Sequence, residues 1–293
     1  MTDFFDVFLL KTVLSMATPL IFAAMGGLIS EKSGVMNIAL EGLMLIGAFF
    51  AVVGAHYLEN AWAGVALGVL AAGATALIHA FWSITLKADQ IVAATAIILL
   101  GSGITVFLLL RFFNQSGQSP RVDRLPTFWG SVSILVPVAF VLVPVVWWVL
   151  NRTKVGLHIQ AAGESPKAAE SVGINVNLYR YVCVTLSGVL AGLGGVFLSI
   201  GDLSLFSREM TQGRGFIALA AVIFGNWTPF GALAACLLFA AAQALPIQAQ
   251  ATGLGVNRDL LLALPYILTL VAIAGFVRKS RAPAGLGEHA TSR

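Results

Sequence analysis

The chain has 293 residues, of which 58% are hydrophobic and 10% are charged, and its mean hydropathy is +0.91. So few polar side chains cannot cover the surface of a water-soluble globule, so the composition predicts an integral membrane protein. The formal net charge of +4 does not indicate nucleic-acid binding, because the basic residues are scattered at the edges of apolar segments rather than clustered with aromatic ones.

Apolar segments long enough to cross a membrane follow one another along the chain. Crossing about 30 Å of hydrocarbon takes about 20 apolar residues, and a helix satisfies every backbone polar group within one segment. We therefore expect an all-α, polytopic membrane bundle of about eight to nine spans, forming a single transmembrane domain over residues 1–277. The clear spans lie at about 8–29, 34–56, 62–86, 91–113, 132–150, 180–200, 230–249 and 260–277, and Phe216 to Phe224 is apolar but too short to cross alone.

Glu41 and Asn37 lie one helical turn apart near the start of the second span, between Gly34 and Gly42. An ionisable group in a membrane segment is costly and is therefore a functional hypothesis by default. Two interpretations stay open. In the structural one, Glu41 accepts hydrogen bonds and pins a short broken helix. In the functional one, Asn37 and Glu41 line a permeation path, or Glu41 relays protons.

Small residues recur at four-residue spacing on two of the predicted spans. The sets are Gly64, Gly68, Ala72 and Ala76 on the third span, and Gly188 and Gly192 on the sixth. Such ridges let helix backbones approach closely, and the pattern favours packing inside the bundle over a dimer face.

The turn between the third and fourth spans is polar and is followed by Gln90 and Thr95. These residues are typical of a solvated loop and the helix after it, or of a polar stripe that faces a cavity. Phe81, at the end of the third span, is placed to stack on a planar ligand or to sit at the membrane interface.

The most polar part of the chain, residues 151–179, separates two long apolar segments. Within it, Ser165 is a candidate helix N-cap, Pro166 suits the first helical position and Gly173 suits a left-handed stop. The pattern predicts a helix of about two turns over residues 167–172, with Ala168, Ala169 and Val172 exposed. So short a helix is unstable alone, so it must pack on its own membrane domain or on a partner.

A further break interrupts the apolar stretch from Phe216 to Ala249. It is made by Gly225, Asn226, Trp227 and Pro229. Either it is a plain turn outside the membrane, or it is non-helical backbone at membrane depth, which must be buried in protein or line a wet cavity.

The distribution of Lys and Arg in short loops predicts the orientation. Residues 151–179 and the basic tail 278–293, which we expect to be disordered, should both be cytoplasmic. Counting crossings then places the amino terminus outside, provided that Phe216 to Phe224 crosses jointly with its neighbours. Arg121 and Arg124 fall outside in this topology, against the general rule.

The sequence contains no motif for binding and hydrolysing ATP, no dinucleotide fingerprint, no zinc-ligand spacing and no serine-hydrolase elbow. Cys183 and Cys236 both lie inside apolar spans, where a thiol behaves as a small hydrophobic group. We therefore expect that the chain is not an enzyme and that it binds no cofactor or metal of its own.

Three blocks of the sequence resemble one family. Gly26 to Gly42 is similar to the early block of permease subunits in ATP-binding-cassette importers of the nucleoside branch, which is related to the ribose and branched-chain amino acid permeases. Ala162 to Gly173 resembles the coupling loop of these permeases, and Gly213 to Gly231 resembles their late block. The ribose-type permeases carry an additional first span that is absent here, which agrees with an outside amino terminus.

The resemblance implies a subunit of the bacterial cytoplasmic membrane that forms a translocation path with a second, similar and longer permease. It implies that ATP is bound by a separate ATPase and that a periplasmic or lipid-anchored protein delivers a nucleoside, or a related purine or pentose ligand. The residues implied to couple to the ATPase are Gly163, Glu164, Ser165, Pro166, Lys167, Ala168, Ala169, Val172 and Gly173. The candidate path residues are Asn37, Glu41, Phe81, Gln90 and Thr95.

Two alternatives remain at this stage. One is an ion-coupled secondary transporter that uses Glu41 as its proton or cation site. The other is a permease of the same importer class that carries a simple sugar.

Overall fold

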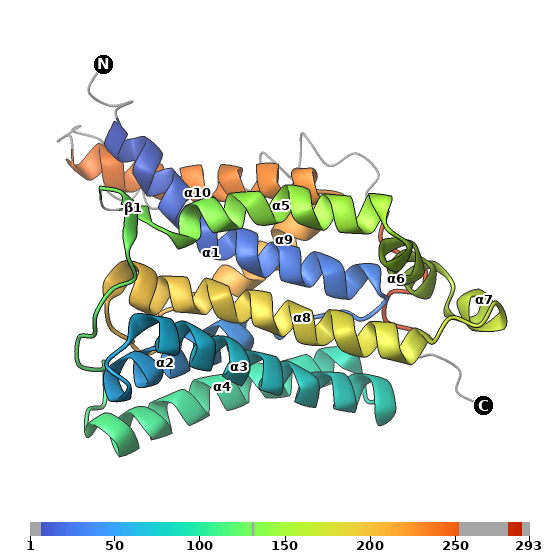
Figure 1. Ribbon diagram of the computed structural model, residues 1–293, viewed down its shortest axis with the longest axis horizontal. Coiled ribbons are helices and arrows are strands. Elements are labelled where there is room, and N and C mark those ends of the chain that lie inside the picture. The colour runs from blue at the N-terminus through green and yellow to red at the C-terminus, as the bar shows by residue number, and fades with distance from the viewer. Residues whose placement is uncertain (1–6, 131, 252–280, 289–293) are drawn as a thin grey trace.

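The computed structural model describes residues 7–130, 132–251 and 281–288, and shows a bundle of long helices (Figure 1). The helices are α1 (Val7–Lys32), α2 (Leu40–Tyr57), α3 (Ala61–Ala80), α4 (Gln90–Phe113), α5 (Leu135–Arg152), α6 (Lys154–Glu164), α7 (Pro166–Ser171), α8 (Val176–Val196), α9 (Arg214–Phe224) and α10 (Pro229–Ala251). Two π-helical segments, η1 (Phe81–Thr85) and η2 (Phe197–Leu203), continue α3 and α8. A small antiparallel hairpin pairs β1 (Thr127–Trp129) with β2 (Val132–Ser133).

Within the described residues, seven helical segments are long and apolar enough to cross a membrane. They correspond to the first seven predicted spans, and the prediction of a polytopic helical membrane bundle is confirmed. The eighth predicted span, 260–277, lies outside the described residues.

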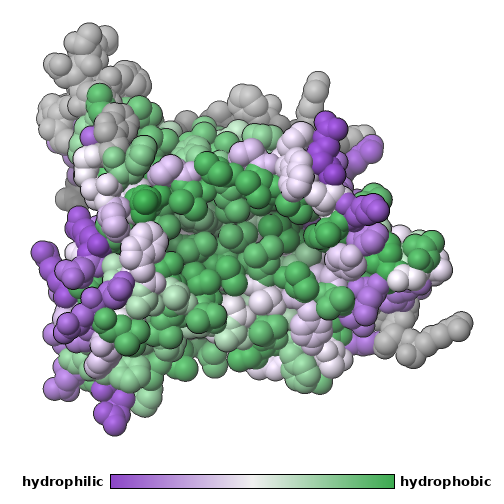
Figure 2. All heavy atoms as spheres, in the orientation of Figure 1, coloured by the Kyte–Doolittle hydropathy of each residue, from purple (hydrophilic) through white to green (hydrophobic). Residues whose placement is uncertain are grey.

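The bundle has two polar ends and an apolar band between them. Helices α6 and α7 lie at one end, here called the α7 end, and the β1–β2 hairpin lies at the other, here called the hairpin end (Figure 1). Figure 2 shows hydrophobic side chains over the middle of this face and hydrophilic ones towards both ends. Large apolar side chains such as Leu70, Leu99 and Phe107 are exposed on α3 and α4, as expected of a surface in contact with lipid.

Glycines allow α2, α3 and α8 to pack with their backbones in close approach. A Cβ on Gly47 of α2 would lie 2.6 Å from both the Cα and the carbonyl oxygen of Gly192 on α8. The two predicted small-residue ridges face each other, because Gly188 lies against Ala76 and Gly192 lies against Ala72. The interpretation of these ridges as internal packing surfaces is therefore confirmed.

The segment from Ser204 to Phe224 crosses the bundle in two parts. Ser204 accepts a backbone hydrogen bond from Val122 near the hairpin end, and the chain then returns into the bundle without regular structure until α9 begins at Arg214. Helix α9 has 11 residues and ends near the α7 end, where the Asn226 Oδ1 atom accepts a hydrogen bond from the Arg281 amide. The prediction that Phe216–Phe224 is too short to cross alone agrees with the length of α9, and its crossing jointly with neighbouring segments stays a prediction.

Residues 281–288, here called the strap, are docked on the α7 end. The Gly285 amide donates to the Gly163 carbonyl at 2.8 Å, and the Gly287 amide donates to the Gly34 carbonyl at 3.0 Å. Arg180 of α8 donates from Nη1 to the Glu288 carbonyl at 2.7 Å. For these eight residues the expectation of a disordered tail is wrong, because their backbone groups are paired with four other segments of the chain, around Gly34, Gly163, Arg180 and Asn226.

The glycine packing makes a test of the helix contacts. We expect Gly47→Ala to lower the free energy of unfolding by about 1–3 kcal/mol, because the added methyl group forces α2 and α8 apart. Gly103→Ala on α4 is the matched control, since a Cβ there would meet nothing within 4 Å. Thermal unfolding of the purified protein in detergent should show a lower midpoint for Gly47→Ala alone, and equal midpoints would contradict the close approach.

Candidate functional site

The carboxylate of Glu41 holds the start of α9. Its Oε1 atom accepts a hydrogen bond from the Gly213 amide at 2.8 Å, and its Oε2 atom accepts one from the Gly215 amide at 2.7 Å. Glu41 is only 7% exposed. An anion at a helix N-terminus satisfies free N–H groups and interacts favourably with the helix dipole. The interpretation of Glu41 as an acceptor of backbone hydrogen bonds is confirmed, and the helix that it holds is α9.

The start of α9 lies well inside the bundle. At about 1.5 Å per residue, the helix is about 16 Å long, which is about half the thickness of the hydrocarbon core. Just beyond its C-terminal end, the Trp227 indole donates to Glu31 Oε2 at 2.5 Å, and Glu31 lies in the last turn of α1 at the α7 end. The N-terminus of α9 is therefore near the middle of the membrane-spanning layer. Discontinuous helices with this placement are a recurrent feature of transporter binding sites.

The predicted helix break at Gly225, Asn226, Trp227 and Pro229 separates α9 from α10. Asn226 and Trp227 have positive φ angles of 52° and 51°, which turn the chain sharply. Because Asn226 contacts the strap and Trp227 contacts the end of α1, the break lies at the α7 end. This placement favours the interpretation as a turn between two helices over the one as a break at mid-membrane depth.

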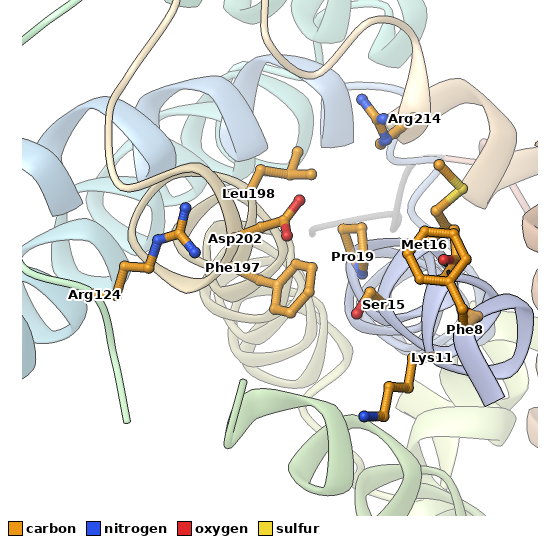
Figure 3. Close-up of a pocket in the computed structure, with 11 residues that line it drawn as sticks. Phe8, Lys11, Ser15, Met16, Pro19, Arg124, Phe197, Leu198, Asp202 and Arg214 are labelled. Carbon is orange, nitrogen blue, oxygen red and sulfur yellow. Dashed lines mark hydrogen bonds between the residues drawn. The ribbon is translucent and has the colours of Figure 1, made fainter. Parts of the chain in front are cut away.

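A pocket of about 260 Å³ lies between α1, η2 and the start of α9. One face of α1 contributes Phe8, Lys11, Thr12, Ser15, Met16 and Pro19, while Phe197, Leu198 and Asp202 come from η2, Arg214 from α9 and Arg124 from the loop after α4. Figure 3 shows Asp202 between the side chains of Arg124 and Arg214, with Phe197 nearby. The pocket therefore combines aromatic surface with charged groups of both signs.

The charged groups of the pocket are placed by the backbone around them. The Arg214 Nη1 atom donates to the carbonyls of Met210 and Thr211 at 3.1 and 3.3 Å, so the guanidinium is fixed by the loop that leads into α9. Arg124 and Arg214 both attract the Asp202 carboxylate electrostatically. Asp202 itself makes no hydrogen bond with any residue that the structure describes. Because Asp202 is exposed, its oxygens are open to water or to a ligand.

None of the five predicted path residues lines this pocket. Asn37 donates to Ser187 Oγ at 2.8 Å, and Gln90 accepts from the Met36 amide at 2.7 Å. Phe81 and Thr95 are exposed on η1 and α4. A role of these residues and Glu41 in the translocation path therefore stays a prediction.

Sequence reasoning missed the charged residues that line the pocket. Lys11 and Asp202 both lie within segments long and apolar enough to span a membrane. The rule that singled out Glu41, that ionisable groups in such segments are functional candidates, applies to them equally. The sequence does not show that Lys11 and Asp202 share a pocket with Arg124 and Arg214, because this depends on how η2 and the loop to α9 fold back.

Helix α7 forms where the sequence predicts it, but its N-terminal capping and its last residue differ from the prediction. Pro166 is at the first helical position, and Gly173 has a φ of +86°. The Ser165 side chain makes no capping hydrogen bond, so the predicted side-chain cap is wrong. Instead, the Ser165 carbonyl accepts from the Ala169 amide at 3.0 Å. The helix ends at Ser171, one residue earlier than predicted.

The exposed surface of α7 also differs from the prediction. Ala169 is only 3% exposed, because it packs with Ala162 of α6 and Val176 of α8. Val172 is 74% exposed, and Lys167 and Ala168 are exposed as well. The chain thus supports its own short helix against α6 and α8, and it leaves Val172 as an apolar side chain in solvent at the α7 end.

These features define a class of protein, a multi-span membrane protein with a half-length helix inside its bundle and a small rigid projection at one end. Residues 9–273 match the family described as the branched-chain amino acid transport system / permease component. The chain belongs to this permease family.

Individual relatives resemble the chain over most of its length. It is 39% identical to the guanosine ABC transporter permease protein NupQ of Bacillus subtilis (strain 168), with 92% of each chain covered. It is 35% identical to the nucleoside ABC transporter permease protein NupC of Lactococcus lactis subsp. cremoris (strain MG1363), with 95% of each covered. It is 36% identical to the putative glucose ABC transporter permease protein TsgC13 of Haloferax volcanii, with 87% of this chain and 82% of the relative covered.

The Glu41 contact can be tested by a single substitution. We expect Glu41→Ala to lower the free energy of unfolding by about 3 kcal/mol, because it leaves two buried amides of the α9 start without a charged acceptor. Glu41→Gln should be milder, since its amide oxygen still accepts one of these bonds. Thermal unfolding in detergent measures both.

Glu59→Gln serves as the control for Glu41→Gln, because Glu59 is exposed at the hairpin end and makes no hydrogen bond that the structure describes. If Glu41→Ala unfolds at the same temperature as the unaltered protein, Glu41 does not hold α9.

Proposed function

We propose that this chain is the permease subunit of an ATP-binding-cassette importer that moves a nucleoside, or a related purine or pentose ligand, into the cytoplasm. The observation that carries the proposal is the half-length helix α9, whose N-terminus lies inside the bundle beside a pocket with charged and aromatic walls. Similarity to a guanosine permease and a nucleoside permease over more than nine-tenths of each chain supports the ligand class.

In this proposal the α7 end faces the cytoplasm and docks on a separate ATPase. Burial of Ala169 fixes α7 on α6 and α8, and a fixed projection transmits force where a flexible one does not. Exposed Val172 and Lys167 supply an apolar contact and a positive charge for the partner. Gly163, Glu164, Ser165, Pro166 and Gly173 set the position of the projection rather than its contact surface.

The same proposal assigns the remaining partners. A second and longer permease completes the translocation path, and a periplasmic or lipid-anchored binding protein delivers the ligand. ATP is bound on the ATPase, so this chain is a transport subunit and not an enzyme. The complex lies in the bacterial cytoplasmic membrane, with the amino terminus of this chain outside and its carboxyl terminus inside. The structure is compatible with this topology, since α1 begins at the hairpin end and the strap lies at the α7 end (Figure 1).

An ion-coupled mechanism at Glu41 is less well supported. Both carboxylate oxygens of Glu41 accept backbone hydrogen bonds, and protonation would remove an acceptor that α9 needs. A sugar remains the alternative ligand, because one relative is named as a putative glucose permease.

Uptake by the reconstituted transporter tests the proposed function. In proteoliposomes that contain this chain, the second permease and the ATPase, with the binding protein added, we expect uptake of radiolabelled guanosine. That uptake should require ATP, survive an uncoupler and resist competition by excess glucose. Uptake by this chain alone, driven by a proton gradient, would contradict the proposal, and competition by glucose would shift the ligand class to sugars.

Docking on the ATPase can be tested at Val172. We expect Val172→Arg to reduce co-purification of the ATPase at least tenfold, because a charged side chain replaces the apolar contact, while thermal stability stays unchanged at this exposed position. Leu58→Arg is the matched control, an equivalent change at a residue that is 62% exposed next to α2 at the hairpin end. Undiminished co-purification with Val172→Arg would remove α7 from the interface. Ala169→Arg is unsuitable, since it would disrupt the packing that supports α7.

A further inference from the structure

The pocket between α1, η2 and the start of α9 brings charged side chains together inside the bundle. Its walls come from α1, from the loop after α4 and from residues 197–214, and they place Asp202, Arg124 and Arg214 around one space (Figure 3). Charged side chains in or beside membrane-spanning segments are costly and are retained mainly where they serve a ligand or an ion.

The wall that carries Asp202 has an unusual backbone. Residues Phe197–Leu203 form a π-helical segment at the end of α8, and such segments are rare and are often found at functional sites. Phe197 and Asp202, which both line the pocket, belong to it. The segment therefore contributes an aromatic ring and a carboxylate to the same space.

The acceptor capacity of the pocket is concentrated on Asp202. This carboxylate makes no hydrogen bond with a described residue, although Arg124 and Arg214 attract it. One guanidinium nitrogen of Arg214 is already engaged by the Met210 and Thr211 carbonyls. The two oxygens of this carboxylate match two neighbouring hydroxyl donors.

We propose that this pocket is a ligand subsite in which Asp202 accepts hydrogen bonds from the vicinal hydroxyls of a neutral ribonucleoside, and Phe197 contacts its base. The inference rests on the proposed function and deepens it. The ribose diol is the part that all ribonucleosides share, so a site that reads the diol accepts several bases. The volume of about 260 Å³ is close to the lower end of small-molecule sites, at about 300 Å³.

The position of the subsite gives it a role in transport. Arg214 is the first residue of α9, and the amides on either side of it are the ones that Glu41 binds. A ligand at Asp202 therefore lies next to the buried start of the half-length helix. The pocket is a place where the ligand rests between its release from a binding protein and its passage into the bundle.

Ligand-induced thermal stabilisation of the purified complex, formed by this chain with its permease and ATPase partners, tests the subsite. The binding protein is left out, so that its own selectivity does not contribute. Uridine at millimolar concentration should raise the unfolding midpoint, since a ligand that binds only the folded state stabilises it. We expect uridine to bind at least threefold more tightly than 2′-deoxyuridine, and Asp202→Asn to abolish that preference.

Two further variants are compared with Asp202→Asn. Asp123→Asn removes an exposed carboxylate of the neighbouring loop and should leave the preference unchanged. Asp202→Glu keeps the charge but moves the carboxylate, so it should weaken the preference without removing it. If Asp202→Asn does not assemble, the Asp202→Glu complex decides, and a preference equal to that of the unaltered protein overturns the assignment.

The outcomes separate this inference from the proposed function. If guanosine uptake depends on ATP but uridine gives no thermal shift, or if Asp202→Asn keeps the preference for uridine, the subsite assignment is wrong and the proposed function stands. If the reconstituted transporter takes up no nucleoside, the proposed function fails and the subsite assignment fails with it.

Discussion

The carboxylate of Glu41 is the contact on which the interior of the bundle depends. It joins the start of α2 to amides that lie 172 and 174 residues further along the chain. Without an acceptor there, the N-terminus of α9 would leave free N–H groups at a depth where water is scarce, at a cost of about 1–3 kcal/mol for each group. With it, the chain can begin a helix near the middle of the membrane layer. Arg214, which stands between the two bonded amides, is thereby placed at the edge of the pocket.

Close backbone approach is the second constraint, and it explains why so many glycines are needed. Gly215 lies against the backbone of Glu41, so any side chain there would push α9 away from the carboxylate that holds it. At the α7 end, Gly163 lies against Lys32 and Gly34, and Gly285 of the strap lies against Gly163. The helix contacts that position α9 and α7 are therefore set by the absence of side chains as much as by hydrogen bonds.

Much of this architecture could be predicted from the sequence, because the membrane imposes simple rules. Seven of the predicted spans appear as helices, and the ridges at Gly64 to Ala76 and at Gly188 to Gly192 face each other as interpreted. Contacts between residues far apart in the sequence could not be predicted from such rules. The structural interpretation of Glu41 was right in kind, but its partners at Gly213 and Gly215 could not be inferred, since nothing local links α2 to α9.

The errors have physical causes of a similar kind. Serine is a residue type that often caps a helix with its side chain. The Ser165 side chain makes no capping hydrogen bond, and its carbonyl accepts from the Ala169 amide instead. The sequence shows that so short a helix needs support but not which of its faces is supported, so it predicted an exposed Ala169, whereas α6 and α8 bury this residue. The strap was expected to be disordered because it is polar and terminal. Its hydrogen bonds to Gly163, Gly34 and Asn226 are tertiary and leave no pattern in the sequence.

These contacts connect the α7 end of the molecule to the pocket through α9. At the α7 end, the strap bonds to Gly163 beside α7 and to Asn226 beyond the C-terminal end of α9, while Trp227 bonds to Glu31 of α1. At its other end, α9 carries Arg214 into the pocket and is held by Glu41. Spatial continuity alone does not establish coupling, which requires an element whose position both sites influence. Helix α9 meets the structural condition, because it is one rigid rod of about 16 Å with one end joined to the segment around α7 and the other beside Asp202. A partner that displaces α7 would act on the strap, because the strap bonds both to Gly163 beside α7 and to Asn226 beyond the end of α9.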